Sequence, residues 1–242
     1  MKTTRIPLPL IAVLMSSALL PDLSQGAVVL DLIGDVSAYT FGVLPGPAPG
    51  QIFTDFPTFN CTVLEEFSVA ASELVINRVS ILFLAQGGYD QFKNVERFSL
   101  NFYTAANRAA TNLTGDVASQ WLTTTTGASV TQVIDPTGSG EFGLVRLDVN
   151  ITLPAAGTYW VGVSPQSAVA ITGQFLVANA NPSGTPTPGN SHADLANPGE
   201  GFGIGALSAL GGDYAYTITA IPEPGSLSLL LLSSAAFLRR RK

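Results

Sequence analysis

The feature that most restricts the fold of this chain is a two-residue alternation of apolar and polar side chains, repeated in short segments within residues 27–221. Every second residue from Val145 to Leu153 is apolar, and the residues between them are polar or charged. Successive side chains of a β-strand point to opposite faces, so this pattern predicts a strand with one face toward a core and the other toward water. Residues 97–103 and 213–219 alternate in the same way.

Other segments complete a set of about ten candidate strands, separated by turns rich in Pro and Gly. Three runs are continuously apolar, which predicts strands covered on both faces: 27–33, 74–84 and 159–163. Four further candidates are 36–43, 61–69, 129–134 and 168–178. The sequence therefore predicts an all-β fold, an antiparallel and jelly-roll-like β-sandwich.

Two segments of the body are expected to lie outside strands. Residues 105–118 fit a helix or a loop equally well, because they are rich in Asn and Thr. Residues 179–201 are rich in Pro, Gly and Asn, and they predict a long surface loop between the last two strands, with a binding loop as the alternative.

The first 26 residues have the features of a secretory signal peptide. Two basic residues precede the apolar run 6–20, and small residues, Ser24 and Gly26, stand at positions −3 and −1 before Ala27. A first core helix is the alternative, but the three prolines in this segment fit a helix poorly. We expect cleavage between Gly26 and Ala27, followed by a sandwich domain over 27–221.

Residues 222–242 combine a short motif, an apolar segment and a basic end. The motif consists of Pro222, Glu223 and Pro224. The uncharged run 225–238 would span about 21 Å as a helix, which is short of a hydrocarbon core of roughly 30 Å. The chain ends in four basic residues, Arg239, Arg240, Arg241 and Lys242. Because basic residues stay on the cytoplasmic side of a membrane, we expect the preceding chain to lie outside. A glycolipid-anchor signal is the alternative, but such signals end in their apolar stretch.

The motif, the short apolar helix and the basic cluster together resemble a PEP-CTERM sorting signal. The resemblance implies export by a Gram-negative bacterium that makes exopolysaccharide. It also implies processing near Pro222-Glu223-Pro224 by an exosortase, a membrane-embedded cysteine protease or transpeptidase. The implied partners are signal peptidase and the export machinery, the exosortase, the membrane before processing, and exopolysaccharide. The resemblance covers only residues 222–242 and says nothing about what the body binds.

Charge excludes one class of partner. The whole chain has a formal net charge of −6, and residues 27–221 carry 15 acidic and five basic residues, a net charge of −10. Nucleic-acid binding needs clustered Lys and Arg that release counterions from the phosphates. We therefore expect no nucleic-acid partner.

The residues of the body offer little catalytic chemistry. The one histidine, His192, could pair with the one cysteine, Cys61, but a small buried side chain is the simpler interpretation of Cys61. Glu65 and Glu66 are adjacent in a predicted strand, so they face opposite ways and cannot act on one substrate as paired glycosidase carboxylates do. We expect no enzyme activity and no catalytic residue.

Two kinds of binding residue remain as candidates. Asp31, Asp35 and Asp213 could hold a structural Ca²⁺, although no EF-hand signature supports such a site. Trp121 lies among polar residues, and we expect it to be exposed and able to stack on a sugar ring. The other aromatic residues of the strands fit core packing better.

These observations predict an exported surface or extracellular-matrix protein with a non-catalytic sandwich, associated with exopolysaccharide. It would be anchored in the membrane during sorting and then lie at the cell surface or outside the cell. A carbohydrate-binding module with a defined sugar site is the first alternative. A polysaccharide hydrolase that uses distant Asp and Glu residues is the second.

Overall fold

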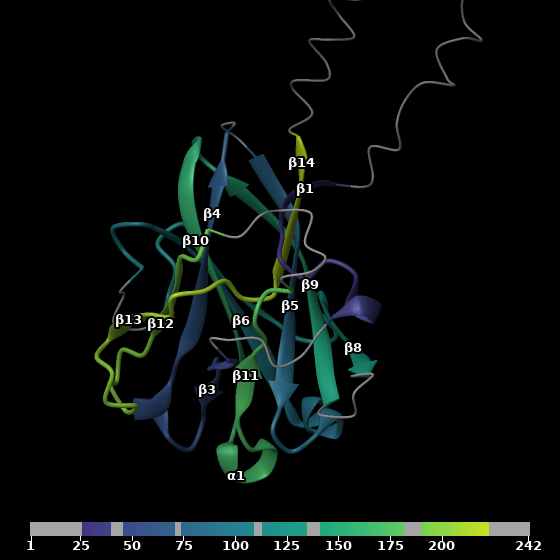
Figure 1. The fold of residues 1–242 in the computed structure, drawn as a ribbon, viewed down its shortest axis with the longest axis vertical. Helices are drawn as coiled ribbons and strands as arrows, with labels where there is room; N and C mark the ends of the chain where they lie inside the picture. The colour runs from purple at the N-terminus through teal and green to yellow at the C-terminus, as the bar shows by residue number, and fades with distance from the viewer. Residues whose placement is uncertain are drawn as a thin grey trace, which may run out of the picture.

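Two seven-stranded sheets pack face to face in this protein (Figure 1). The computed structural model describes residues 26–39, 46–70, 74–108, 113–134, 141–181 and 190–222. Nearly all strand pairs within these residues are antiparallel, the exception being the short parallel pair of β3 and β10. The predicted all-β sandwich is therefore confirmed, while the helices expected at both ends of the chain lie outside the described residues.

The first sheet is centred on the long strand β5. Its strands are β1 (Ala27–Asp31), β14 (Tyr216–Pro222), β5 (Leu74–Ala85), β11 (Phe175–Val177), β2 (Ala48–Pro49), β9 (Glu141–Leu153) and β8 (Ala128–Ile134). One side of β5 pairs with β9, and the other side pairs first with β14 and then with β11.

The second sheet is centred on β10. Its strands are β13 (Leu207–Ala209), β12 (Ala193–Ala196), β4 (Thr62–Val69), β10 (Gly157–Ser167), β6 (Arg97–Thr104), β7 (Ala118–Leu122) and β3 (Ile52–Phe53). The described helices are short and lie in the connections: η1 (Val36–Ala38), η2 (Pro57–Phe59), η3 (Tyr89–Asn94) and α1 (Val169–Thr172).

The main core fills the space between the sheets. The alternation in β9 places Val145, Leu147, Ile151 and Leu153 in it, as predicted. Aromatic side chains from both sheets complete it: Phe83 comes from β5 of the first sheet, and Phe67 of the second sheet lies edge-on to Phe102 with 6.0 Å between the ring centroids. Burial of these apolar faces is the dominant favourable contribution to folding.

The outer face of the second sheet differs from the prediction. Ser99 and Asn101 of β6 were expected to face water, but both are buried together with Tyr103. Residues 113–117 lie over this face: the amide of Gly115 donates to Asn101 Oδ1 (3.2 Å), and Leu113 packs in a small apolar cluster with Tyr103. The period of the strand identified its two faces correctly but could not show that a loop covers the outer one.

Three segments also depart from the predicted elements, and in a fourth, residues 105–118, the described part takes the loop that was one of the two predicted alternatives. In 36–43, the described part begins with the 3-10 helix η1, which Asp35 caps through the amide of Ser37. Residues 168–178 divide into α1 and β11, because Gly173 adopts a φ of 66° between them. The predicted loop 179–201 contains β12. The described part of 105–118 forms turns and loop up to the start of β7.

The first and last strands lie side by side. Ala27 of β1 pairs with Ala220 of β14, so β1 begins where β14 ends, and α1 lies at the opposite end of the sandwich (Figure 1). Among the described residues, no helix has the length and apolar character needed to cross a bilayer. The proposed membrane segment 225–238 and the basic residues 239–242 lie outside the described residues, as does most of the predicted signal peptide.

Two buried tyrosines provide a test of how the sheets are joined. The Tyr216 hydroxyl donates to Val63 O (2.9 Å) in the other sheet and accepts from Val163 N (3.1 Å), whereas the Tyr103 hydroxyl has no hydrogen-bond partner among the described residues. We predict that Tyr216→Phe lowers the free energy of unfolding by about 1–3 kcal/mol, because it leaves buried backbone groups unpaired.

Tyr103→Phe is the matched control. It removes an unsatisfied hydroxyl, so we expect unchanged or increased stability in urea unfolding. Equal losses in both variants would contradict this account of the sheet interface.

Candidate functional site

Trp121, the residue predicted to contact sugar, is exposed as expected. It lies on the edge strand β7, and its residue surface is 43% accessible. The guanidinium of Arg97 stacks over the indole at 3.9 Å from the ring centroid and also donates to the side chain of Gln166. A stacked arginine occupies part of the surface that a sugar would need.

The other candidate aromatic residues are core residues. Tyr159, Trp160, Tyr214 and Tyr216 are all buried. Trp160 faces away from the main core, where Arg108 covers its ring at 4.8 Å from the centroid and is itself paired with Asp194 at 2.7 Å. These contacts agree with the packing interpretation made from the sequence.

Glu65 and Glu66 face opposite sides of β4, as the strand period predicted. Glu65 points between the sheets, where its Oε2 accepts from the amide of Tyr214 (2.8 Å) and its Oε1 has no partner in the part of the chain that the structure describes. Burial raises the pKa of Glu65 well above its ordinary value. The hydrogen bond from the amide of Tyr214 acts in the opposite direction, and the nearby negative charges of Asp213 and Glu66 raise the pKa further. The two carboxylates therefore cannot share one substrate.

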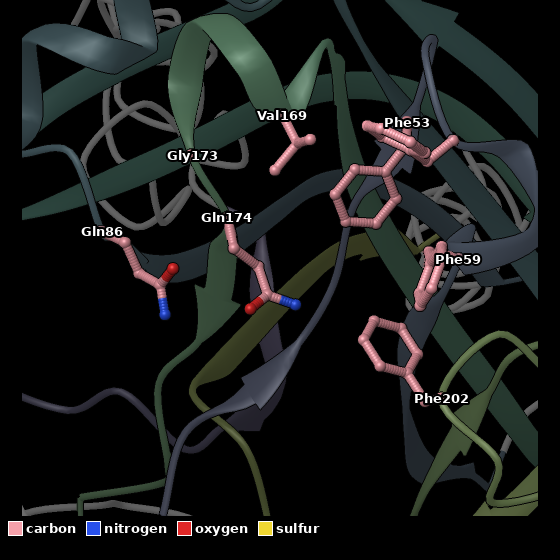
Figure 2. Close-up of a pocket in the computed structure, with 8 residues that line it drawn as sticks. Phe53, Phe59, Gln86, Val169, Gly173, Gln174 and Phe202 are labelled. Carbon is pink, nitrogen blue, oxygen red and sulfur yellow. The ribbon is translucent and has the colours of Figure 1, made fainter.

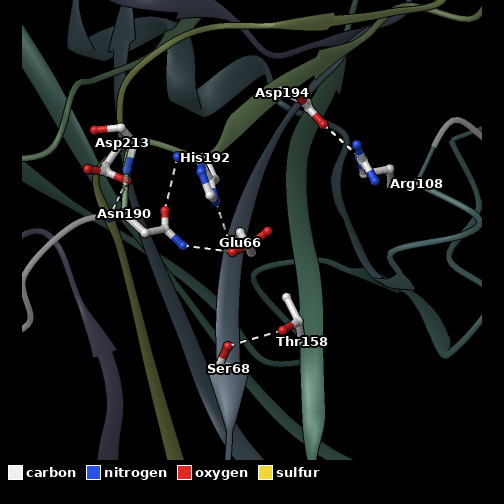
Figure 3. A network of polar contacts seen from close by, with 9 residues as sticks. Glu66, Ser68, Arg108, Thr158, Asn190, His192, Asp194 and Asp213 are labelled. Atoms are coloured by element: carbon white, nitrogen blue, oxygen red, sulfur yellow. Dashed lines mark hydrogen bonds and ion pairs between the residues drawn. The ribbon is translucent and has the colours of Figure 1, made fainter.

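Glu66 belongs to a polar network on the outside of the second sheet (Figure 3). Its Oε1 accepts from Asn190 Nδ2 at 2.9 Å and lies 3.3 Å from His192 Nδ1. Asp213 accepts from the amides of Asn190 and Ser191 at 3.0 and 2.7 Å. These bonds hold residues 190–192 against β4 just before β12, so the network has a structural role.

The remaining chemical candidates are not brought together. Cys61 is fully buried, and burial raises the pKa of its thiol to about 12, whereas the side chain of His192 is largely exposed. The carboxylate of Asp31 accepts from the amides of Ile33 and Gly34, and that of Asp35 accepts from Ser37. Among the described residues, no three His, Cys, Asp or Glu side chains form a group that could hold a metal ion.

A pocket that the sequence analysis missed lies at the α1 end of the sandwich (Figure 2). Its cavity volume is about 360 Å³, within the range of small-molecule sites. It is lined by Phe53, Phe56, Phe59, Gln86, Val169, Gly173, Gln174 and Phe202. These residues come from five connections or strand ends of both sheets, and loops on a rigid scaffold often carry binding sites.

The pocket has two chemically different walls. Figure 2 shows the rings of Phe53, Phe59 and Phe202 on one side and the amide side chains of Gln86 and Gln174 on the other. Phe59 and Phe202 meet edge-to-face at 5.2 Å. We refer to Phe53, Phe56, Phe59 and Phe202 as the phenylalanine wall and to Gln86 and Gln174 as the amide wall.

Hydrogen bonds hold the loops behind these walls in place. Asp55 accepts from the first amides of α1, those of Val169 (3.0 Å) and Ala170 (3.2 Å). Desolvation alone would raise the pKa of Asp55, but these bonds hold it below its ordinary value. On the other side of the pocket, Asn197 connects two loops: its Nδ2 donates to Asn60 O (2.9 Å), and its Oδ1 accepts from the amide of Phe202 (3.2 Å).

Part of this pocket left a signal in the sequence. Phe53, Phe56 and Phe59 occur within seven residues that also contain a proline, which is an unusual density of large apolar side chains for a turn. Phe202 and Gln174 are distant in sequence, and only the fold brings them to the same place. Comparison of the chain with family models, curated proteins and solved structures finds no match.

The buried carboxyl of Glu65 should make stability depend on pH. Its pKa is higher in the folded protein than in the unfolded chain, so the folded protein binds more protons between these two values. The stability that this proton uptake contributes is fully present below the unfolded pKa of about 4.3, and it is lost as the pH rises through the pKa of Glu65 in the folded protein. We predict that Glu65→Gln flattens the fall in unfolding free energy between mildly acidic and neutral pH, measured by urea unfolding.

Glu200→Gln is the control for this change, because it removes one negative charge from an exposed loop. It should retain the pH dependence of the unchanged protein. The assignment would fail if Glu65→Gln and Glu200→Gln gave the same slope of stability against pH.

Proposed function

We propose that this chain is an exported surface or extracellular-matrix protein whose sandwich is a non-catalytic binding module. In this proposal the ligand enters the pocket between the phenylalanine and amide walls. The observation that carries the proposal is the placement of this pocket at the α1 end, opposite the end where β1 begins and β14 stops (Figure 1).

This placement gives the module an orientation. The predicted signal-peptide cleavage, between Gly26 and Ala27, falls where β1 begins, and the Pro222-Glu223-Pro224 motif starts at the last residue of β14. Both processing sites would thus lie at one end of the sandwich. A chain held in the membrane by residues 225–242 would present the pocket roughly 40 Å away, the length of a 13-residue strand such as β9.

The partners in this proposal follow from the sorting signal. Signal peptidase and the export machinery would act on the N-terminal segment, and an exosortase would act near the Pro222-Glu223-Pro224 motif. The basic residues 239–242 would keep the C-terminal helix anchored at the cytoplasmic face until processing. The processed sandwich would then lie at the surface or in the matrix, in contact with exopolysaccharide.

A hydrolase has less support than a binding module. Glycosidases need two carboxyl groups roughly 5–9.5 Å apart across the scissile bond. The eight residues that line the pocket include no acid, and Glu65 and Glu66 face opposite sides of β4. A carbohydrate-binding module is the alternative that the pocket itself favours, because aromatic and amide side chains line it.

We predict that replacing Pro222, Glu223 and Pro224 by alanine leaves export intact but causes the full-length protein to accumulate in the membrane. The measurement is the intact mass of the protein in membrane and surface fractions of an exosortase-containing host. Phe59→Ala is the control, because it alters the pocket and should be processed normally. An unchanged processed mass in the triple variant would contradict the proposed sorting step.

A further inference from the structure

The lining of the pocket points to the class of ligand that it binds. We propose that the pocket takes an uncharged sugar residue of a glycan, with its C–H face against the phenylalanine wall and its hydroxyl groups on the amide wall. This inference rests on the proposed function, which assigns the pocket a ligand but not its chemistry.

The absence of ionisable side chains from the lining favours an uncharged ligand. None of the eight lining residues carries a charge. A carboxylate or an ammonium group that entered the pocket would lose water without gaining a counter-charge, which is costly. The adjacent carboxylate of Asp55 already accepts from the amides of Val169 and Ala170 behind the wall.

The phenylalanine wall requires an apolar face on the ligand. The accessible fraction is 50% for Phe56 and 36% for Phe59, although both are large apolar residues. A flat ligand with C–H groups on one side would remove these rings from water, and aromatic rings are suited to such stacking.

The amide wall requires polar groups on the same ligand. The side chains of Gln86 and Gln174 have no hydrogen-bond partner within the described part of the chain, and each offers two N–H donors and a carbonyl acceptor. A hydrocarbon ligand would bury these amides without partners, at a cost in free energy. Sugar hydroxyls donate and accept, so they match both functions of an amide.

The backbone around the pocket argues against a peptide that binds as an added β-strand. A peptide that binds as an added strand needs free backbone groups at a sheet edge. Here the amide of Phe53 donates to Asn60 Oδ1 (2.8 Å), and the amide of Gln86 donates to Gln174 O (3.0 Å). The amide of Phe202 also has a partner. These three amides are therefore not free to pair with an added strand, and recognition at these positions falls to side chains, as expected for a sugar site.

A glycan array tests the ligand class directly. The probes are oligomers of neutral hexoses, pentoses and N-acetylhexosamines, with hexuronic-acid oligomers as the charged counterpart. We expect saturable binding to at least one neutral oligomer, little affected by salt because no ion pair is involved. Titration calorimetry with that oligomer should show about tenfold or greater loss of affinity in Phe59→Ala and in Gln174→Ala, about 1.4 kcal/mol or more.

Two controls match these variants in chemistry. Ile134→Ala removes an exposed apolar side chain, and Gln132→Ala removes an exposed amide, both on strand β8 outside the pocket. Each should bind the oligomer as the unchanged protein does. Thermal unfolding of all four variants shows whether each one retains the fold. If one of the two pocket variants does not fold, the other still tests the proposal.

Several results would overturn the sugar assignment. These are binding to hexuronic-acid oligomers alone, binding to no neutral oligomer, or binding lost in Trp121→Ala but kept in Phe59→Ala. A dimer that Phe59→Ala dissociates, measured by light scattering, would instead make a second copy the occupant. If the unchanged protein binds no neutral sugar but Phe59→Ala is retained less well in the native matrix, the pocket still has a binding function. In that case the proposed function stands, and only the assignment of a sugar ligand is wrong.

Discussion

The apolar interface between the two sheets is the constraint on which the rest of this structure depends. The central strands β5 and β10 contribute to it from opposite sides, and both also carry buried residues on their outer faces. A polar group inside this interface therefore needs a hydrogen-bond partner within the protein, because water does not reach it. The Tyr216 hydroxyl bonds to the backbone of the opposite sheet, whereas only one carboxylate oxygen of Glu65 has a partner among the described residues, and burial raises the pKa of this carboxyl group.

A rigid interface of this kind leaves the ends of the sandwich free to differ. At one end the first and last strands lie side by side, so both predicted processing sites meet there. At the other end, connections from both sheets meet around the pocket, and Asp55 and Asn197 hold them in place through bonds to the backbone. The proposed division into a tethered end and a binding end follows from this topology.

The polar residues that attract attention in the sequence have mainly structural contacts. Glu66 and His192 fasten the segment before β12, and Arg97 covers Trp121. The pocket, in contrast, is built from phenylalanine and glutamine side chains, which carry no catalytic signature in a sequence. A binding function built on shape and stacking is harder to recognise from a sequence than one built on charged or metal-binding residues.

The sequence by itself determined the all-β class, the strands with clear alternation, the opposite facing of Glu65 and Glu66, and the exposure of Trp121. These properties are local, because the side-chain period of a strand depends only on neighbouring residues. Only the tertiary structure decided that a loop buries Asn101, that residues 179–201 contain β12, and that Phe59 faces Phe202 and lies across the pocket from Gln174. Those outcomes depend on contacts between segments far apart in the chain, about which the period of a strand carries no information.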